Sequence, residues 1–224
     1  MASKVSAILI SVILSGALVG GGVYFYSKTE IDELTRAKES LQQELNQLKK
    51  GTPPPVVKPV NHVAVRGEEV LAAFKNGDYS KLSTYIHPDK GVLFSPYSHV
   101  DPTKDKSFTP SQIKEMSGNT RVYEWGSYDG SGEPIKLNFA GYVKKFVYDK
   151  DFLTVKQVSF NHPIVKGNTI NNAAEKYPDA TIIEYHFPGT PKNDGMDWSS
   201  LRLVFENKDG VWYLVGVIHD QWTI

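Results

Sequence analysis

The 224-residue sequence contains no cysteine. This absence excludes disulfide scaffolds, zinc sites with thiolate ligands, cysteine nucleophiles and an N-terminal lipid-modified cysteine. An excess of either charge is also missing, because 25 lysine and arginine residues balance 25 aspartate and glutamate residues. The sequence therefore lacks the basic excess that is typical of nucleic-acid-binding proteins, and we expect no nucleic-acid partner.

The motifs of common enzyme and metal sites are missing as well. Gly130-Ser131-Gly132 is followed by Glu133-Pro134, which is not the spacing of a nucleotide-binding loop. No nucleophile-elbow, HExxH or calcium-loop pattern occurs, and none of the six histidines has a partner four residues away. We therefore predict no metal site and no cofactor, and the sequence names no catalytic residue.

A long uncharged segment lies near the N-terminus. Residues 5–27 contain no charged side chain and are bracketed by Lys4 and Lys28. About 20 apolar residues cross the hydrocarbon core of a bilayer, so we predict a transmembrane helix over 5–27. A cleaved signal peptide is the alternative, but Val23-Tyr24-Phe25-Tyr26 continues the apolar run beyond the glycines that would precede cleavage.

The predicted span gives a single-pass protein of the cell membrane. A short head with one lysine, residues 1–4, is typical of a signal-anchor that leaves its head in the cytoplasm. The basic residues that follow the span oppose this orientation, so the positive-inside rule does not decide it. The lack of cysteine suits an exported domain of a Gram-positive type. We predict an extracytoplasmic C-terminal domain.

Residues 28–50 are predicted to form a helical stalk. Core positions of the a/d pattern of a coiled coil recur three and four residues apart, with Lys38 as one polar a position, at Ile31, Leu34, Lys38, Leu41, Leu45 and Leu48. The pattern covers only about two and a half heptads, so a solvated spacer helix is the alternative. Gly16 and Gly20 form a small-xxx-small pair within the span. Together these features predict a parallel homodimer through the span and the stalk.

A Pro-rich linker, residues 51–61, separates the stalk from a globular domain over 62–224. Proline fixes φ and cannot donate to a helix or a ladder, so Pro53-Pro54-Pro55 predicts an extended spacer. In the domain, apolar spacing and cap signals predict helices over 70–76, 78–86, 109–118 and 139–146. Residues 136–137, before the last of these, could instead extend a strand. Alternating segments predict strands over 91–95, 121–128, 156–161, 180–187, 200–206 and 211–219.

The last two strands form a hairpin around the turn Asn207-Lys208-Asp209-Gly210. Strict alternation places Leu201, Leu203 and Phe205 on one face with Trp212, Leu214, Gly216 and Ile218, and this is the predicted core face. Continued alternation brings Asp220 and Trp222 to the rim of the same face. We name Asp220, Trp222 and Trp212 as candidate ligand-binding residues. Fraying of the strand, which would leave Asp220 in water, is the alternative.

Two resemblances follow from these segments. The Phe74-Lys75-Asn76-Gly77-Asp78 joint, followed by strands that end in Asp209-Gly210-Val211-Trp212-Tyr213, resembles the nuclear transport factor 2-like superfamily over most of 62–220. The resemblance implies a cone-like α+β fold, in which a curved antiparallel sheet wraps around N-terminal helices. The domain also resembles uncharacterised membrane-anchored exported proteins of Gram-positive bacteria, on segments such as His219-Asp220-Gln221-Trp222. Neither resemblance supplies a function.

The sequence therefore predicts a membrane-anchored, extracytoplasmic binding or interaction module of unknown ligand, more readily than an enzyme. The alternative is a small-molecule isomerase or hydrolase that uses a polar residue in the cone pocket. Titratable groups that converge in one deep cavity would favour the enzyme. A cavity closed by aromatic side chains would favour the module.

Overall fold

The computed structural model describes residues 35–43, 46 and 62–223. The chain divides into two compact units, residues 1–59 and 60–224. In the first unit, residues 35–43 form a helix. The predicted span at 5–27, the linker at 51–61 and most of the predicted stalk lie outside the described residues. Within the described ranges, no helix combines the length and the apolar character that a membrane crossing requires.

The second unit begins with helices whose ends are set by caps. Its helices and 3-10 turns are α3 His62–Asn76, α4 Tyr79–Tyr85, α5 Pro110–Lys114, α6 Phe139–Phe146, α7 Ala173–Lys176, η1 Phe152–Thr154 and η2 Pro191–Asn193. Gly77 follows α3 with a φ of 63°, a conformation that glycine adopts without strain. The side chains of Asp78 and Asn138 accept amide hydrogen bonds at the starts of α4 and α6, and Thr109 and Gln112 form the predicted capping box of α5.

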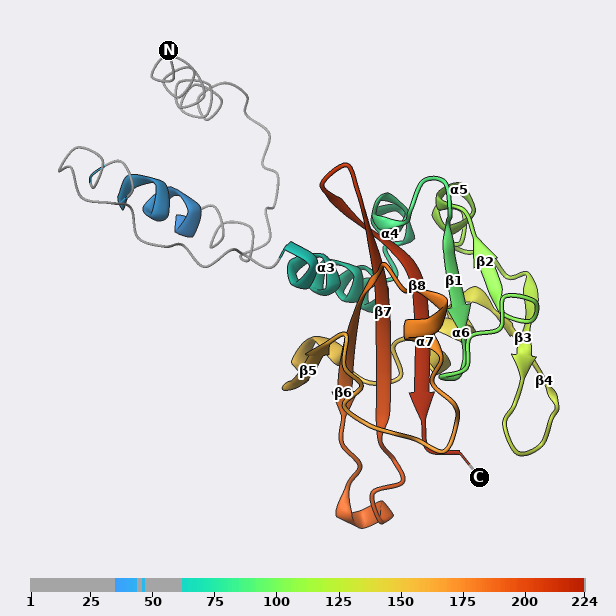
Figure 1. Ribbon diagram of the computed structural model, residues 1–224. Helices are drawn as coiled ribbons and strands as arrows, with labels where there is room; N and C mark the ends of the chain where they lie inside the picture. Colours follow the sequence, from blue (N-terminus) through green and yellow to red (C-terminus); the bar gives the residue numbers. More distant parts are fainter. Residues whose placement is uncertain (1–34, 44–45, 47–61, 224) are drawn as a thin grey trace. The chain divides into compact units, whose positions relative to one another are not determined.

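The strands build one large sheet and one small sheet. They are β1 Val92–Ser95, β2 Lys106–Phe108, β3 Val122–Ser127, β4 Pro134–Asn138, β5 Gln157–Phe160, β6 Thr181–Phe187, β7 Ser199–Lys208 and β8 Val211–Gln221. Over residues 62–223 the large sheet has the order β2-β1-β8-β7-β6-β5, and β3 pairs with β4 (Figure 1). The large sheet is curved and does not close. Together with the helices it makes the domain a mixed α+β fold.

One strand pair departs from the antiparallel sheet that the sequence predicts. β1 and β8 run parallel, whereas the other pairs of the large sheet are antiparallel. The two parallel strands are separated by most of the domain, so no hairpin forces the chain to reverse between them.

One face of the large sheet, here called the inner face, carries the main core. Apolar side chains of α3, α4, α5 and α6 pack there against those of β7 and β8. Aromatic rings fill the part of this core that lies farther from the large sheet. Trp125 stacks on Tyr142 with ring centroids 3.8 Å apart, and Phe94 meets both rings edge-on. Trp125 and Tyr142 are fully buried.

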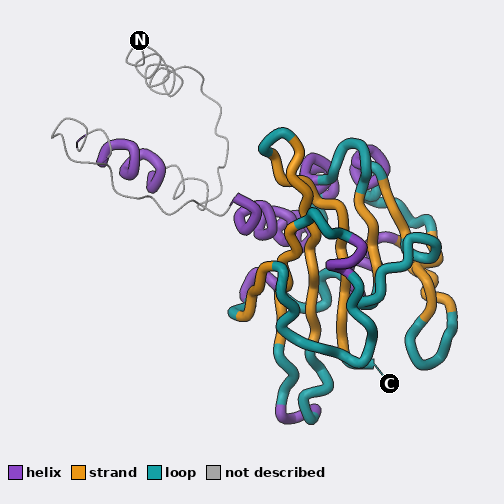
Figure 2. The backbone as a smooth tube through the Cα atoms, in the orientation of Figure 1, coloured by secondary structure: helices purple, strands orange, loops and turns teal. Residues whose placement is uncertain are grey.

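The opposite face, here called the outer face, carries a smaller apolar cluster. Val204, Val215 and Ile218 lie there with Ala173 of α7. The connection between β5 and β6, which contains α7, runs across this face (Figures 1 and 2). The sheet is thus covered on both sides, by helices on the inner face and mainly by irregular chain on the outer face.

A β-bulge in β8 reverses the predicted facing of the end of the strand. Val204 pairs with Gly216 and Phe205 pairs with Leu214, so Val215 is an extra residue. Before the bulge, Leu214 faces inward as predicted. Beyond it, Val217 faces inward and Ile218 faces outward. The predicted placement of Gly216, Ile218 and Asp220 on the core face is therefore wrong, because one inserted residue inverts the alternation of every later side chain.

Candidate functional site

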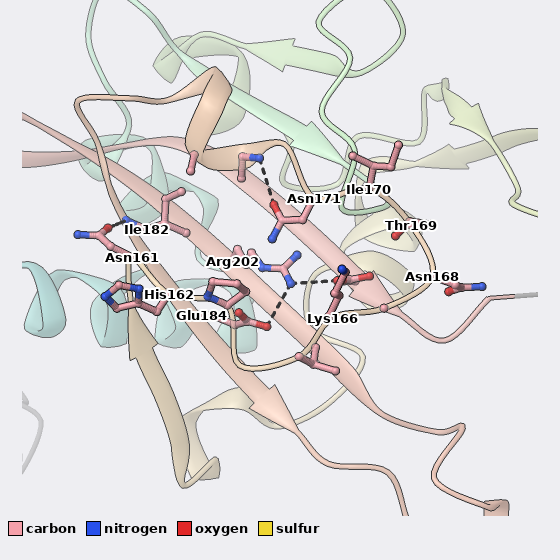
Figure 3. A pocket seen from close by; sticks show the side chains of 16 residues that line it. Asn161, His162, Lys166, Asn168, Thr169, Ile170, Asn171, Ile182, Glu184 and Arg202 are labelled. Carbon is pink, nitrogen blue, oxygen red and sulfur yellow. Dashed lines mark hydrogen bonds and ion pairs between the residues drawn. The ribbon is translucent and has the colours of Figure 1, made fainter.

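The outer face holds a cavity of about 570 Å³, here called the outer-face pocket. Its floor is formed by side chains of three adjacent strands, Glu184 of β6, Arg202 of β7 and Asp220 of β8. Its walls come from residues 161–174 of the connection between β5 and β6 (Figure 3). Val165, Ile170 and Ile182 make part of the wall apolar. A cavity of this size is in the range of small-molecule sites.

The floor of the pocket is a buried cluster of three charges. Nη2 of Arg202 lies 3.2 Å from Oε1 of Glu184 and 3.0 Å from Oδ2 of Asp220 (Figure 3). Each of the three residues is at most 2% exposed. The register of the strands explains why these three side chains lie together. Glu184 pairs directly with Arg202. Asp220 is two residues beyond Ile218, which is the partner of Arg202 on β8. Two carboxylates and one guanidinium have a net charge of −1.

Three polar atoms around the pocket have no hydrogen-bond partner among the described residues. They are Oδ1 of Asp220, Nε of Arg202 and Oγ1 of Thr169, and all three are buried. The other polar atoms of the guanidinium and of Glu184 are engaged, since Nη1 of Arg202 donates to Ser98 and Oε2 of Glu184 accepts from the Ile164 amide. Nearly all buried polar groups in folded proteins find a partner. Unsatisfied polar atoms in residues that line a cavity are therefore candidates for pairing with a ligand.

Polar contacts attach the wall of the pocket to the rest of the domain. The Ile164 amide donates to Glu184 at 2.9 Å. Asn172, which is buried, accepts from the Val100 amide at 2.8 Å and donates to its carbonyl at 3.0 Å. Asn168 donates to the carbonyl of Thr223 and accepts from its hydroxyl. The wall lacks regular structure over most of its length, but hydrogen bonds at these three points attach it to the rest of the domain.

Gly167 brings the wall close to the charged floor. A Cβ at this position would lie 3.1 Å from the Trp198 ring and 3.5 Å from Oδ1 of Asp220. The first distance is shorter than an ordinary van der Waals contact, so a larger residue would push the wall away from Trp198. The glycine thus lets backbone approach the unpartnered oxygen of Asp220.

The structure separates the three residues that the sequence names as a site. Asp220 is on the floor of the outer-face pocket. Trp222 is 42% exposed and lines a smaller cavity of about 220 Å³ with Tyr97 and Lys145. Trp212 is partly buried against the main core, near the other end of β8. The alternative of fraying is wrong for Asp220, because β8 continues to Gln221 and Asp220 is 2% exposed.

Sequence reasoning missed the two partners of Asp220. Arg202 and Glu184 sit in apolar strands, and alternation assigns Arg202 to a face away from the core, where a charge is expected to meet water. The signal that could have found them is the composition of that face. Val204, Val215 and Val217 share it in the predicted register, so it is too apolar for solvent. A charged side chain within such a face requires a buried partner.

The inner face holds a second polar cluster that has the residue types of a catalytic triad. The Ser199 hydroxyl donates to Asp149 at 2.8 Å and lies 3.2 Å from Nε2 of His219. The same Nε2 is 3.4 Å from Asp149, whereas Nδ1 has no partner. In a triad, the carboxylate orients the histidine through the nitrogen that does not face the serine. This arrangement therefore does not activate Ser199, and His219 is fully buried.

Burial and hydrogen bonding shift the pKa values of groups near both clusters. Burial would raise the pKa of Asp149, but hydrogen bonds and charge from His219, and a hydrogen bond from Ser199, outweigh it and hold the pKa below its usual value. Burial lowers the pKa of His186, which lies beside Ser200 on β7. Within the described part of the chain, no three acidic or histidine side chains are grouped for a metal ion.

Comparisons with known proteins show only weak similarities. No family model and no curated protein matches the sequence. Similar solved structures include a proposed calcium/calmodulin dependent protein kinase II association domain from Xanthomonas campestris, with 15% identity, a TM-score of 0.33, and coverage of 75% of this chain and 90% of that chain. A proposed dehydratase of the NTF2-like family from Streptomyces avermitilis has 12% identity, a TM-score of 0.27, and coverage of 73% and 95%.

A DUF4783 family protein from Bacteroides ovatus is similar at 11% identity, with a TM-score of 0.29 and coverage of 70% of this chain and 94% of that chain. TM-scores at this level carry no argument about function. The curved, open sheet and the mixed α+β composition of this domain agree with the fold that the sequence predicts, and membership of the nuclear transport factor 2-like superfamily stays a prediction. The nature of the site rests on its own geometry.

Proposed function

We propose that the domain is a binding module that takes a small polar ligand in the outer-face pocket. The observation that carries the proposal is the pair of unpartnered, buried atoms at the floor, Oδ1 of Asp220 and Nε of Arg202. An acceptor and a donor with no protein partner are costly unless something else pairs with them. A ligand that bonds to both would remove that cost.

The contacts that the ionisable groups of the pocket make with one another support binding over catalysis. Three titratable groups converge in the pocket, which is the pattern expected of an enzyme. However, Arg202 is already in contact with both carboxylates, and among the residues that the structure describes no serine, histidine or lysine forms a nucleophile–base pair with them. The cone interior, where the alternative places an isomerase or hydrolase site, contains stacked aromatic rings.

We further propose that this module is held outside the cell by the predicted span at 5–27 and the predicted stalk at 28–50. The support is the uncharged segment and the a/d pattern of the sequence. A reporter that is active only outside the cytoplasm, fused after Ile224, should be active in cells. Activity from a cytoplasmic reporter alone would reverse the orientation.

Ligand binding can be tested with the purified full chain and a panel of compounds. The panel should contain cationic, anionic, zwitterionic and neutral compounds of roughly 6 to 14 heavy atoms, which suit a cavity of this size. We expect at least one charge class to bind and to shift the amide NMR signals of Gly167 and Asn171. Ala174 is exposed and lines the pocket, so Ala174→Trp should block binding without disturbing the core. If no compound binds, or if binding survives Ala174→Trp, the proposal fails.

A further inference from the structure

The charge of the pocket floor indicates which class of ligand it takes. Resting on the proposed function, we propose that the outer-face pocket binds a compound in which a primary ammonium group stands next to a carbonyl group. Oδ1 of Asp220 accepts from the ammonium group, and Nε of Arg202 donates to the carbonyl oxygen. The compound is either free or the N-terminus of a peptide.

The first step of the argument is the sign of the buried charge. Glu184 and Asp220 carry two negative charges against the single positive charge of Arg202, and all three side chains are at most 3% exposed. An uncompensated buried charge is strongly unfavourable. A cationic ligand neutralises the floor, whereas an anionic ligand would raise its net charge to −2. Lys166 also lines the pocket, but it is exposed and forms no ion pair within the described residues.

The second step is the position of the two free atoms. Oδ2 of Asp220 contacts the guanidinium group whose Nε is unpartnered. The free acceptor and the free donor therefore belong to two groups in direct contact. A compact ligand that pairs with both atoms carries its donor and its acceptor only a few bonds apart. An ammonium group bonded to the carbon next to a carbonyl meets this requirement.

The third step is the wall around the floor. Val165, Ile170 and Ile182 offer apolar surface to the rest of the ligand. An aliphatic side chain next to the ammonium and carbonyl groups would be buried against them. Leucinamide combines the three features in one small molecule and has a single positive charge at neutral pH. It is the probe of choice.

The test uses calorimetry on the full chain to compare leucinamide with compounds that lack the ammonium group. 4-Methylpentanamide lacks only the ammonium group, whereas 4-methylpentanoate lacks the ammonium group and also carries a carboxylate in place of the amide. We expect leucinamide to bind at least about tenfold more tightly than either, as a charge-assisted buried hydrogen bond predicts. Leucyl-glycyl-glycinamide shows whether the natural ligand is a free compound or the N-terminus of a peptide. It should bind like leucinamide if peptide N-termini are accepted, and more weakly if only free compounds fit.

Three variants locate the effect on binding. In Asp220→Asn, the side-chain oxygen remains with Arg202 and the NH₂ group faces the pocket, so the preference for leucinamide over 4-methylpentanamide should vanish. Glu175→Gln removes the same charge from exposed α7 and should leave the preference intact. Lys166→Gln should strengthen leucinamide binding or leave it unchanged, whereas an anion site would be weakened.

The outcomes separate the two proposals. Equal or tighter binding of 4-methylpentanamide or 4-methylpentanoate, blocked by Ala174→Trp, overturns the ammonium assignment and leaves the binding module standing. The ammonium assignment is also overturned, and the binding module also stands, if leucinamide does not bind while a compound of another charge class does. If no compound of any class binds, both proposals fall. The comparison of probes on the unmodified chain decides the matter even if Asp220→Asn does not fold.

Discussion

Asp220 shows how much one residue's role depends on its neighbours. Sequence alternation places it at the rim of the core face, and the structure places it on the outer face with Glu184 and Arg202. What sets its role is an oxygen that the ion pair with Arg202 leaves without a partner, in a residue that lines a cavity. No property of Asp220 within its own strand indicates this, because both partners come from other strands.

Trp125 and Trp212 should differ in their effect on the stability of the domain. Trp125 is fully buried and stacks on Tyr142, whereas Trp212 is only partly buried. We therefore expect Trp125→Ala to lower the free energy of unfolding by about 3–5 kcal/mol. Trp212→Ala should lower it clearly less, although the sequence places Trp212 on the predicted core face. Urea denaturation of both variants, followed by far-UV circular dichroism, provides the comparison, and equal losses would contradict it.

Asp105 should make the domain less stable as pH rises. Burial raises its pKa to about 6, although hydrogen bonds from Asp101 and Ser95 oppose the shift. Because the folded state holds this proton more tightly than the unfolded state, stability is highest below pH ~4 and falls as the pH increases to about 6. Asp105→Asn retains an acceptor oxygen and removes the charge.

The stability difference between Asp105→Asn and the unmodified chain should therefore grow in favour of the variant between about pH 4 and pH 6, then level off. Urea midpoints measured at several pH values test this. Asp179→Asn, at an exposed aspartate, reports the effect of removing a surface charge. A difference for Asp105→Asn that declines with pH would show that the carboxylate is stabilised by its surroundings.

At the scale of elements, the closing hairpin depends on a close approach of β7 and β8. A Cβ at Gly216 would lie 3.0 Å from the Val204 side chain and 3.3 Å from the Tyr177 hydroxyl. Gly216→Ala should therefore destabilise the domain, by about 1–3 kcal/mol for an overpacked site. The double variant with Val204→Ala should recover part of the loss, because the clash is relieved. Chemical denaturation of the single and double variants tests this, and strict additivity would place the clash elsewhere.

The elements themselves were largely predictable, and their pairing was not. Caps such as Asp78 and Asn138 are local signals, and the helices that follow them are found where they were expected. Strand alternation identified β5 to β8 within a few residues. The bulge at Val215 arises from the pairing of β8 with β7, so alternation within one strand cannot reveal it. The short β2 and α7 lie in segments without clear periodicity and were missed.

At the scale of the whole molecule, the stalk predicts how copies of the chain meet. Leu41 lies in the helix at 35–43 and is 60% exposed. If the a/d seam joins two parallel stalks, a cysteine at Leu41 should form disulfide-linked dimers in membranes. The chain has no other cysteine, so the link is unambiguous. Glu39→Cys, off the seam on the same helix, is the control. Equal crosslinking at both positions would indicate random collision and a stalk that is only a spacer.

The hydrogen bonds that hold the pocket wall at three points have a consequence for the rate at which a ligand enters. Irregular segments over a site often act as lids, and binding then waits for the lid to open. Here Glu184, Asn172 and Thr223 hold the wall in place before any ligand arrives. Observed association rates should then rise linearly with ligand concentration, without the plateau of a gated site. Asn172→Ala, which releases one point, should introduce a plateau, so the kinetics would show whether irregular backbone can be as preformed as a strand.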